Sequence, residues 1–206
     1  MKIAVIGSGN VGSTLALAFQ KAGHDIVFGV RNTESFKGKE FAIQHNLAFK
    51  EVSESVNWAE VIVVSAPGNL AAEIGADLGD VKGKVVIDTM NTPFNKVLAY
   101  DSTADALIAT TKNADVIKCF NTTGFENMAH PTFHGAGIDM FIAGGSEHAK
   151  KVATQLAREI GFGEVYDFGG NDKFHLIEQF ASVWINLAIT QKKGRDIAFK
   201  IVRRGH

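Results

Sequence analysis

The feature that most constrains this chain is a glycine-rich segment near its amino end, Gly7-Ser8-Gly9-Asn10-Val11-Gly12, which reads G-x-G-x-x-G. The residues before it, Lys2 to Ile6, form a short, mostly apolar run with the length of a buried strand. After it, apolar residues recur at helical spacing as far as Gly23, and a second strand-like run follows at residues 25–30. Strand, glycine turn, helix and strand in this order are the context in which the pattern binds a dinucleotide.

Each glycine of the motif has a separate physical role. Gly7 lets the chain turn sharply off the strand, Gly9 leaves room for a pyrophosphate beside the backbone, and Gly12 lets the helix pack closely on the sheet. The unpaired N–H groups at the start of the helix would then face the phosphates. We therefore expect Gly7, Ser8, Gly9, Asn10, Val11 and Gly12 to bind a dinucleotide. The alternative is a tight turn that binds no ligand.

The end of the second strand indicates which dinucleotide binds. A site for NAD usually has an Asp or Glu there, which accepts a hydrogen bond from the ribose 2′-hydroxyl. This chain has Arg31 and Asn32 instead. A guanidinium cannot accept that bond but suits a 2′-phosphate. The residues favour NADP over NAD, with Arg31 and Asn32 at the adenosine end; the alternative is an ordinary surface arginine.

Composition limits the classes of function. With 206 residues the chain is long enough to bury a core without a disulfide or a metal. Its net charge of −1 gives no support to nucleic-acid binding. No apolar run reaches the roughly 18 residues that a membrane helix needs, and the first strand begins at once, without a targeting segment. We expect a cytoplasmic protein that binds neither nucleic acid nor membrane.

Strand-like and helical segments alternate through the rest of the chain, which predicts an α/β fold of the Rossmann-like, doubly wound type with a mostly parallel sheet. Further strands are expected at residues 48–52, 61–64, 84–88, 115–120, 140–143 and 164–168. Ligands of such folds lie at the carboxyl ends of the strands. Ser65, Ala66, Pro67 and Asn91 follow strands of this sheet and are therefore candidates for cofactor binding.

The carboxyl-terminal part reads differently. Residues 1–170 are expected to form the NADP-binding domain, and residues 171–206 a helical appendage packed on that domain or on the partner of a homodimer. Apolar residues recur at helical spacing from Lys173 to Arg204, with Gly194 as a point of interruption. Basic residues gather at the end of this segment. These basic residues are Lys192, Lys193, Arg195, Lys200, Arg203 and Arg204. They either complement the negative end of a helix dipole or attract the anionic tail of a ligand.

Other reactive side chains do not assemble into a site. His130 and His134 are four residues apart, but Pro131 lies between them and no carboxylate completes a metal site. Cys119 lies inside an apolar run, where a buried core thiol is expected. We assign no catalytic side chain and no metal.

The motifs together resemble the NADPH-dependent reductases of the deazaflavin coenzyme F420. The resemblance is carried by the glycine motif with its helix, by Val27 to Asn32, by Val116 to Thr122 and by Phe141 to Gly145. It covers most of the chain, and the cytoplasmic domain of membrane ferric reductases looks like a relative. Family members often have a Ser-Arg-Arg or Ser-Arg-Asp run where this chain has Val30-Arg31-Asn32, so one phosphate ligand stands where others have two.

The resemblance implies an oxidoreductase that transfers a hydride between NADPH and a second redox ring. That ring is the deazaflavin coenzyme F420 or a flavin, and Phe120, Asn121 and Thr122 would lie beside the two rings. Such a reaction needs positioning more than it needs side-chain chemistry. Two alternatives stay open: an NADP-dependent reductase of a small carbonyl or imine, and an NADP-binding sensor without catalysis.

Overall fold

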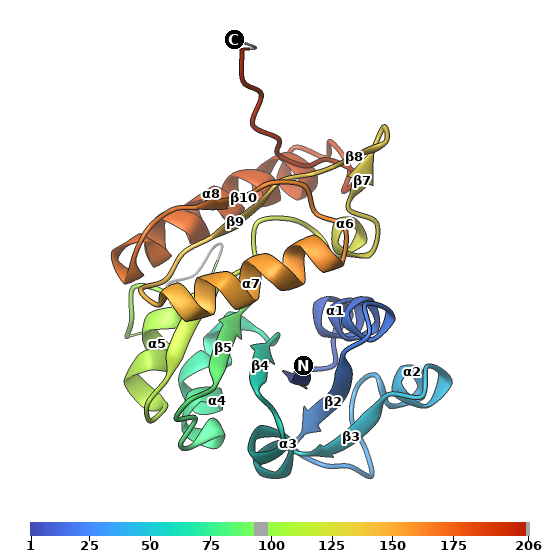
Figure 1. The fold of residues 1–206 in the computed structure, drawn as a ribbon, viewed down its shortest axis with the longest axis vertical. Helices are drawn as coiled ribbons and strands as arrows, with labels where there is room; N and C mark the ends of the chain where they lie inside the picture. Colours follow the sequence, from blue (N-terminus) through green and yellow to red (C-terminus); the bar gives the residue numbers. More distant parts are fainter. Residues whose placement is uncertain (93–98, 205–206) are drawn as a thin grey trace.

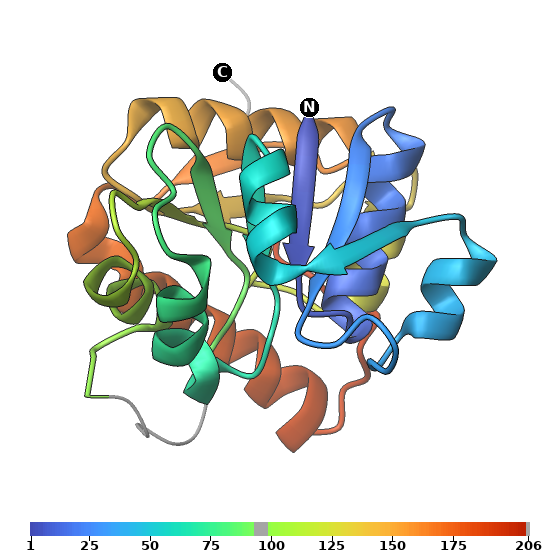
Figure 2. The ribbon, with the colours of Figure 1, turned by 90° about the horizontal axis from the view of Figure 1, so that it is seen from below.

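The computed structural model describes residues 1–92 and 99–204. A parallel sheet of six strands lies at its centre, in the order β3-β2-β1-β4-β5-β6 (Figures 1 and 2). The strands are β1 (Lys2–Ile6), β2 (Asp25–Val30), β3 (Ala48–Glu51), β4 (Val61–Val64), β5 (Val85–Asp88) and β6 (Asp115–Lys118). Because β2 and β4 lie on opposite sides of β1, the strand order reverses there. The predicted doubly wound α/β fold is confirmed.

Both faces of the sheet are covered, and β1 shows why its residues are almost all apolar. Ile3 and Val5 belong to one core, whereas Ala4 and Ile6 belong to the other. The first core lies beneath α1 (Asn10–Lys21) and α7 (Glu147–Glu159), and α7 packs across β5 and β6 (Figure 1). The second lies beneath α3 (Val52–Trp58), α4 (Ala71–Leu78) and α5 (Thr103–Thr110). Alternating side chains of one strand therefore seal two cores.

Shorter elements connect these layers. They are α2 (Lys39–Gln44), the 3-10 turn η1 (Gly68–Leu70), α6 (Phe125–Ala129) and the hairpin β7 (Thr132–Phe133) and β8 (Ala136–Gly137). The segment around His130 and His134 thus contains a short helix and a hairpin. Residues 93–98 lie outside the part that the structure describes.

Beyond β6 the chain builds a second layer. β9 (Met140–Ile142) and β10 (Val165–Asp167) pair in parallel, and Ala143 forms an antiparallel bridge with Lys118 at the end of β6. The turn η2 (Asn171–Lys173) leads into α8 (Phe174–Ile185), which lies beside β9 and β10 in Figure 1. Among residues 1–92 and 99–204, no helix combines the length and the apolar character that crossing a membrane requires.

The last helix is shorter than its sequence pattern predicts. After α8, one π-helical turn, η3 (Asn186–Thr190), ends the helical segment, and residues 191–204 have no regular structure. Lys192 and Gly194 have φ values of 54° and 89°, in the left-handed region that interrupts an α-helix. The helical pattern expected from Lys173 to Arg204, with Gly194 as a point of interruption, thus ends at Thr190, and the prediction was wrong for the residues beyond it. Residues 191–204 instead form an irregular segment, which we call the C-terminal arm, and its end projects from the body in Figure 1.

Candidate functional site

The glycine motif forms the turn between β1 and α1, and its three glycines meet different surroundings. Gly7 has a φ of 106°, and a Cβ built on it would lie 2.0 Å from the carbonyl oxygen of Ser65. A Cβ on Gly12 would lie 1.9 Å from the carbonyl oxygen of Gly7. A Cβ on Gly9, in contrast, would meet no atom of the described residues within 4 Å. The fold thus requires glycine at the outer two positions, whereas at Gly9 it leaves an open space.

The open space at Gly9 faces the amino end of α1. Gly9 is the N-cap residue and makes no side-chain capping bond, and the first turn of α1 carries no acidic residue. The first N–H groups of a helix lack intrahelical partners and carry the positive end of the helix dipole. This part of the molecule therefore fits a phosphate group, which accepts hydrogen bonds from such N–H groups.

A first hollow of about 260 Å³ lies beside the turn, between the ends of β1 and β2 and the helix α4. Of the residues predicted to bind the cofactor, Gly7, Ser8, Arg31, Asn32 and Ala66 line it. The largely apolar surroundings, which include Ile74, suit a flat aromatic base. The predicted adenosine end of the site is therefore a real concavity.

Arg31 lies at the rim of this hollow, in an ion pair that the sequence did not suggest. Its Nη2 is 2.7 Å from Oε1 of Glu73, and its Nε is 3.9 Å from Oδ2 of Asp77. Both carboxylates belong to α4, and the side chains of Arg31 and Glu73 are 58% and 54% exposed. An exposed pair of this kind contributes only ~0–1 kcal/mol, so a phosphate can compete for the guanidinium. Asn32 accepts hydrogen bonds from the N–H groups of Glu34 and Ser35 and thereby shapes the turn after β2.

A second hollow of about 650 Å³ opens on the other side of the glycine turn. The predicted residues that line it are Gly7, Ser8, Gly9, Asn10, Val11, Ser65, Ala66, Pro67 and Asn91. Five other lining residues were not among the predicted cofactor-binding residues: Thr89, Met90, Lys37, whose carbonyl oxygen accepts a hydrogen bond from the Ser8 hydroxyl, Phe125 of α6, and Arg195 of the C-terminal arm. The second hollow therefore joins the amino end of α1 to the carboxyl ends of β4 and β5.

Phe120, Asn121 and Thr122, which were expected beside the two rings, are all buried, and none of them is among the described residues that line the two hollows. Asn121 forms a reciprocal pair with Asn91: the Asn91 amide donates to the carbonyl oxygen of Asn121 at 2.7 Å, and the Asn121 amide donates to Oδ1 of Asn91 at 3.0 Å. Phe120, however, has a φ of 67° and is fully buried, with its ring packed against Phe19 and Phe162. Thr122 is also buried. Neither Phe120 nor Thr122 is among the residues that line the two hollows, because the left-handed turn directs the chain into the core.

A buried charged cluster beside the second hollow was missed by the sequence analysis. Nζ of Lys118 lies 2.8 Å from Oδ2 of Asp88 and 2.7 Å from Oε1 of Glu178, and it donates to the carbonyl oxygen of Met90 at 2.9 Å. The Thr103 hydroxyl donates to Asp88 at 2.6 Å. Met90 lines the second hollow, so the cluster holds part of its wall. The available signal was a lysine in the middle of an apolar strand, where a buried charge requires partners.

Burial and ion pairing shift the pKa values of the three charged residues of this cluster in opposite directions. Burial raises the pKa of Asp88 above its ordinary value, although Lys118 and Thr103 oppose the shift. For Lys118, burial alone would lower the pKa, but Asp88 and Glu178 outweigh it and hold the pKa above its usual range. For Glu178, burial is outweighed by Lys118, and the pKa is lowered. The geometry fits one ammonium shared between two carboxylates.

The remaining reactive residues lie elsewhere. Cys119 is fully buried, and burial raises the pKa of its thiol, so it is a core residue as expected. His130 and His134 are exposed. Within residues 1–92 and 99–204, no group of three or more His, Cys, Asp or Glu side chains could hold a metal ion.

Comparisons with known proteins agree with this geometry. A family model described as "NADP oxidoreductase coenzyme F420-dependent" matches residues 2–92. The F420-dependent NADP reductase of Methanothermobacter marburgensis is 28% identical over 213 residues, which cover 93% of this chain and 94% of that one. A crystal structure from Arthrobacter sp. FB24, described as an F420-dependent NADP reductase, superposes with a TM-score of 0.86 at 26% identity and covers 98% of this chain and 100% of that one.

The relation to ferric reductases is also supported. The rat metalloreductase STEAP3 is 26% identical over 163 residues, which cover 78% of this chain but 32% of that protein. Its match is thus partial, whereas the reductases above match from end to end. In its motifs, its fold and these matches, the chain is similar to the coenzyme F420-dependent NADP oxidoreductases.

Proposed function

We propose that this protein transfers a hydride between NADPH and the ring of the deazaflavin coenzyme F420. The observation that carries the proposal is Gly9, where the fold leaves open space in front of the uncapped amino end of α1. A structural turn would not need that space, whereas a pyrophosphate does. The first hollow then receives the adenosine and the second hollow receives the nicotinamide with the acceptor.

The chain's contribution to the reaction is positioning. With both partners bound, the C4–H bond of the nicotinamide breaks, the hydride carries its electron pair to C5 of the deazaflavin, and water supplies the proton that the reduced ring takes up. The protein must hold the two carbons ~3–3.5 Å apart. Among the described residues that line the second hollow there is no His, Cys, Asp or Glu, which supports a reaction without a catalytic side chain.

Isotope transfer tests the proposal directly. The protein is mixed without oxygen with NADPH that carries deuterium at both C4 positions and, in separate reactions, with coenzyme F420, FMN and a panel of small ketones and imines. We expect loss of the nicotinamide absorbance with F420, and one deuterium at C5 of the reduced ring by mass spectrometry. Turnover of the ketones or imines alone, or binding of NADPH without turnover of any acceptor, would contradict the proposal.

Arg31 provides a test of cofactor choice. We expect Arg31→Ala to weaken NADPH binding by ~1.5–3 kcal/mol, the usual contribution of hydrogen bonds to a charged group, and hardly to change NADH binding. Glu73→Gln should act in the opposite direction, because it frees the guanidinium and removes a negative charge near the 2′-phosphate. Fluorescence titrations with both nucleotides measure these effects. Equal losses of NADPH and NADH binding in Arg31→Ala would contradict the assignment of the 2′-phosphate to this residue.

Several further assignments stay predictions. They are the individual contacts of the cofactor-binding residues, the division into residues 1–170 and 171–206, the cytoplasmic location, the lack of nucleic-acid binding and the homodimer. The exposed apolar residues of α8, Leu176 and Val183, are compatible with a partner on that helix.

A further inference from the structure

The C-terminal arm returns to the second hollow and is fixed there. The indole N–H of Trp184 donates to the carbonyl oxygen of Ile197 at 2.6 Å. The amide of Asn127, which is 2% exposed, donates to the same oxygen at 2.7 Å and to the carbonyl oxygen of Arg195 at 3.3 Å. The arm is thus pinned by α8 on one side and by α6 on the other, directly around Arg195.

The side chain of Arg195 is held as firmly as its backbone. Its guanidinium carbon lies 5.2 Å from the centre of the Phe125 ring and 5.4 Å from the Trp184 ring, within the range of cation–π contacts. Its Nε donates to Oε1 of Glu126. Partial burial would raise the pKa of Glu126, but the hydrogen bond from Arg195, a backbone hydrogen bond and the charge of Arg195 together outweigh it and lower that pKa. This bond uses one of the five N–H donors of a guanidinium. It therefore orients the group and leaves other N–H donors for a ligand.

The positions of the charged residues around the second hollow indicate what the oriented guanidinium of Arg195 can bind. Of the lining residues within 1–92 and 99–204, none is acidic, and two are basic, Lys37 and Arg195. Lys37 follows β2 and lies with Ser8 on the turn side, where the amino end of α1 already meets the expected pyrophosphate. Arg195 belongs to the C-terminal arm instead and lies against α6, at the wall made by Phe125. The phosphates of the dinucleotide are expected on the turn side of the hollow. The guanidinium of Arg195, at the opposite wall, therefore has no negatively charged group of the dinucleotide to bind.

We propose that Arg195 binds an anionic group carried by the redox acceptor, a phosphate or carboxylate on the side chain of its ring. The inference rests on the proposed function, because it takes the second hollow as the place where nicotinamide and acceptor meet. It makes Arg195 a determinant of acceptor specificity: rings that bear a negative side chain bind better than the same rings without one. A pre-oriented guanidinium favours such binding because little ordering is required when the ligand arrives.

Two deazaflavins that differ by one phosphate test this inference. The protein is saturated with NADP⁺ and titrated with 5-deaza-FMN and with 5-deazariboflavin, and the change in ring fluorescence gives each dissociation constant. We expect the parent protein to bind the phosphate-bearing compound about tenfold more tightly, as one charge-assisted hydrogen bond would give. In Arg195→Gln this preference should disappear, with unchanged affinity for 5-deazariboflavin and for NADPH. Arg195→Lys, which keeps the charge, should restore part of it.

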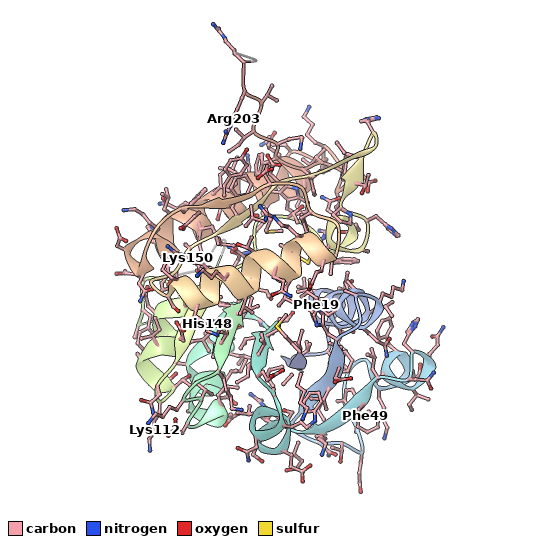
Figure 3. The ribbon with its side chains drawn as sticks, in the orientation of Figure 1. Phe19, Phe49, Lys112, His148, Lys150 and Arg203 are labelled. Carbon is pink, nitrogen blue, oxygen red and sulfur yellow. The ribbon has the colours of Figure 1, made fainter. Side chains whose placement is uncertain are left out.

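Arg203→Gln is the matched control. Arg203 lies on the same arm (Figure 3), but its guanidinium carbon lies 5.9 Å from the centre of the Tyr166 ring, and Arg203 is not among the residues that line the second hollow. It should leave all three affinities unchanged. Three results would overturn the inference: no preference in the parent protein, equal losses for both deazaflavins in Arg195→Gln, or a loss of NADPH affinity of the same size. Failure of hydride transfer with the binding preference intact would contradict the proposed function alone.

Discussion

Replacement of Lys118 by methionine should lower the free energy of unfolding by ~3–5 kcal/mol, the usual effect of removing one partner from a buried ion pair. The side chain of Lys118 is fully buried, and its ammonium contacts Asp88, Glu178 and Thr103. Methionine fills a similar volume but leaves two carboxylates buried without a cation. Denaturant unfolding of the variant and the parent protein near neutral pH measures the loss.

The effect should depend on pH with a defined sign. Without the ammonium, burial raises the pKa values of both carboxylates in the folded variant, so its destabilisation is present at neutral pH and is relieved as the pH falls through those raised values. In the parent protein the lowered pKa of Glu178 acts in the other direction, because its contribution is lost on acidification. The difference in stability between the two proteins should therefore shrink as the pH falls from neutrality, first through the raised pKa values of the variant and then, below the ordinary range of a glutamate, through the loss of the Glu178 contribution in the parent protein.

Lys112→Met is the control for this prediction. Lys112 is exposed and lies at the far edge of the molecule from the C-terminal arm in Figure 3. Its replacement should change stability by no more than ~0.5 kcal/mol. A loss below ~1 kcal/mol in Lys118→Met, or a loss that grows on acidification, would contradict the assignment of one ammonium to two carboxylates.

The second large effect is expected at Gly9. Gly9→Val should weaken NADPH binding by ~3 kcal/mol or more, the upper end of what overfilling a packed site costs, because the new side chain occupies the space in front of α1. Gly9 has a φ of −76°, which any residue adopts, so the folded protein should lose only ~1 kcal/mol from the poorer N-cap. Calorimetric titration with NADPH and thermal unfolding separate the two quantities.

Gly12→Ala is the contrasting variant. Its Cβ would lie 1.9 Å from a backbone oxygen of the same turn, so the loss of stability should exceed ~4 kcal/mol and prevent folding at moderate temperature. The two substitutions in one motif are thus expected to have different effects. Gly9→Val should mainly weaken NADPH binding, whereas Gly12→Ala should mainly destabilise the fold. If Gly9→Val binds NADPH as the parent does, the pyrophosphate does not lie at this position.

Local features made much of this fold predictable. The glycine turn, the strand β4 and the helix α7 each carry their own signal: a fixed glycine spacing, four consecutive β-branched residues, and Ser146 as an N-cap whose hydroxyl accepts from the N–H of Ala149. The order of strands then follows from the connections between them. These elements could be predicted because the information for each lies within a few residues.

The features that were missed depend on residues far apart in the chain. Phe120 ends an apolar run, and only its left-handed turn directs its ring into the core instead of the second hollow. Lys118 and Glu178 are 60 residues apart, so no local pattern pairs them. Arg195 reached the wall of the second hollow because the helix ends earlier than its apolar period suggests, and that end is set by Lys192 and Gly194.

The position of α8 has a consequence for the order in which the protein matures. Phe174 and Ile177 of α8 belong to the same core as Ala4 and Ile6 of the first strand. During synthesis the nucleotide-binding half leaves the ribosome first, with α3, α4 and α5 already available to cover most of this core. The part that α8 covers is closed only when the last quarter of the chain has emerged, so apolar side chains of the sheet stay exposed to water there until translation is nearly complete.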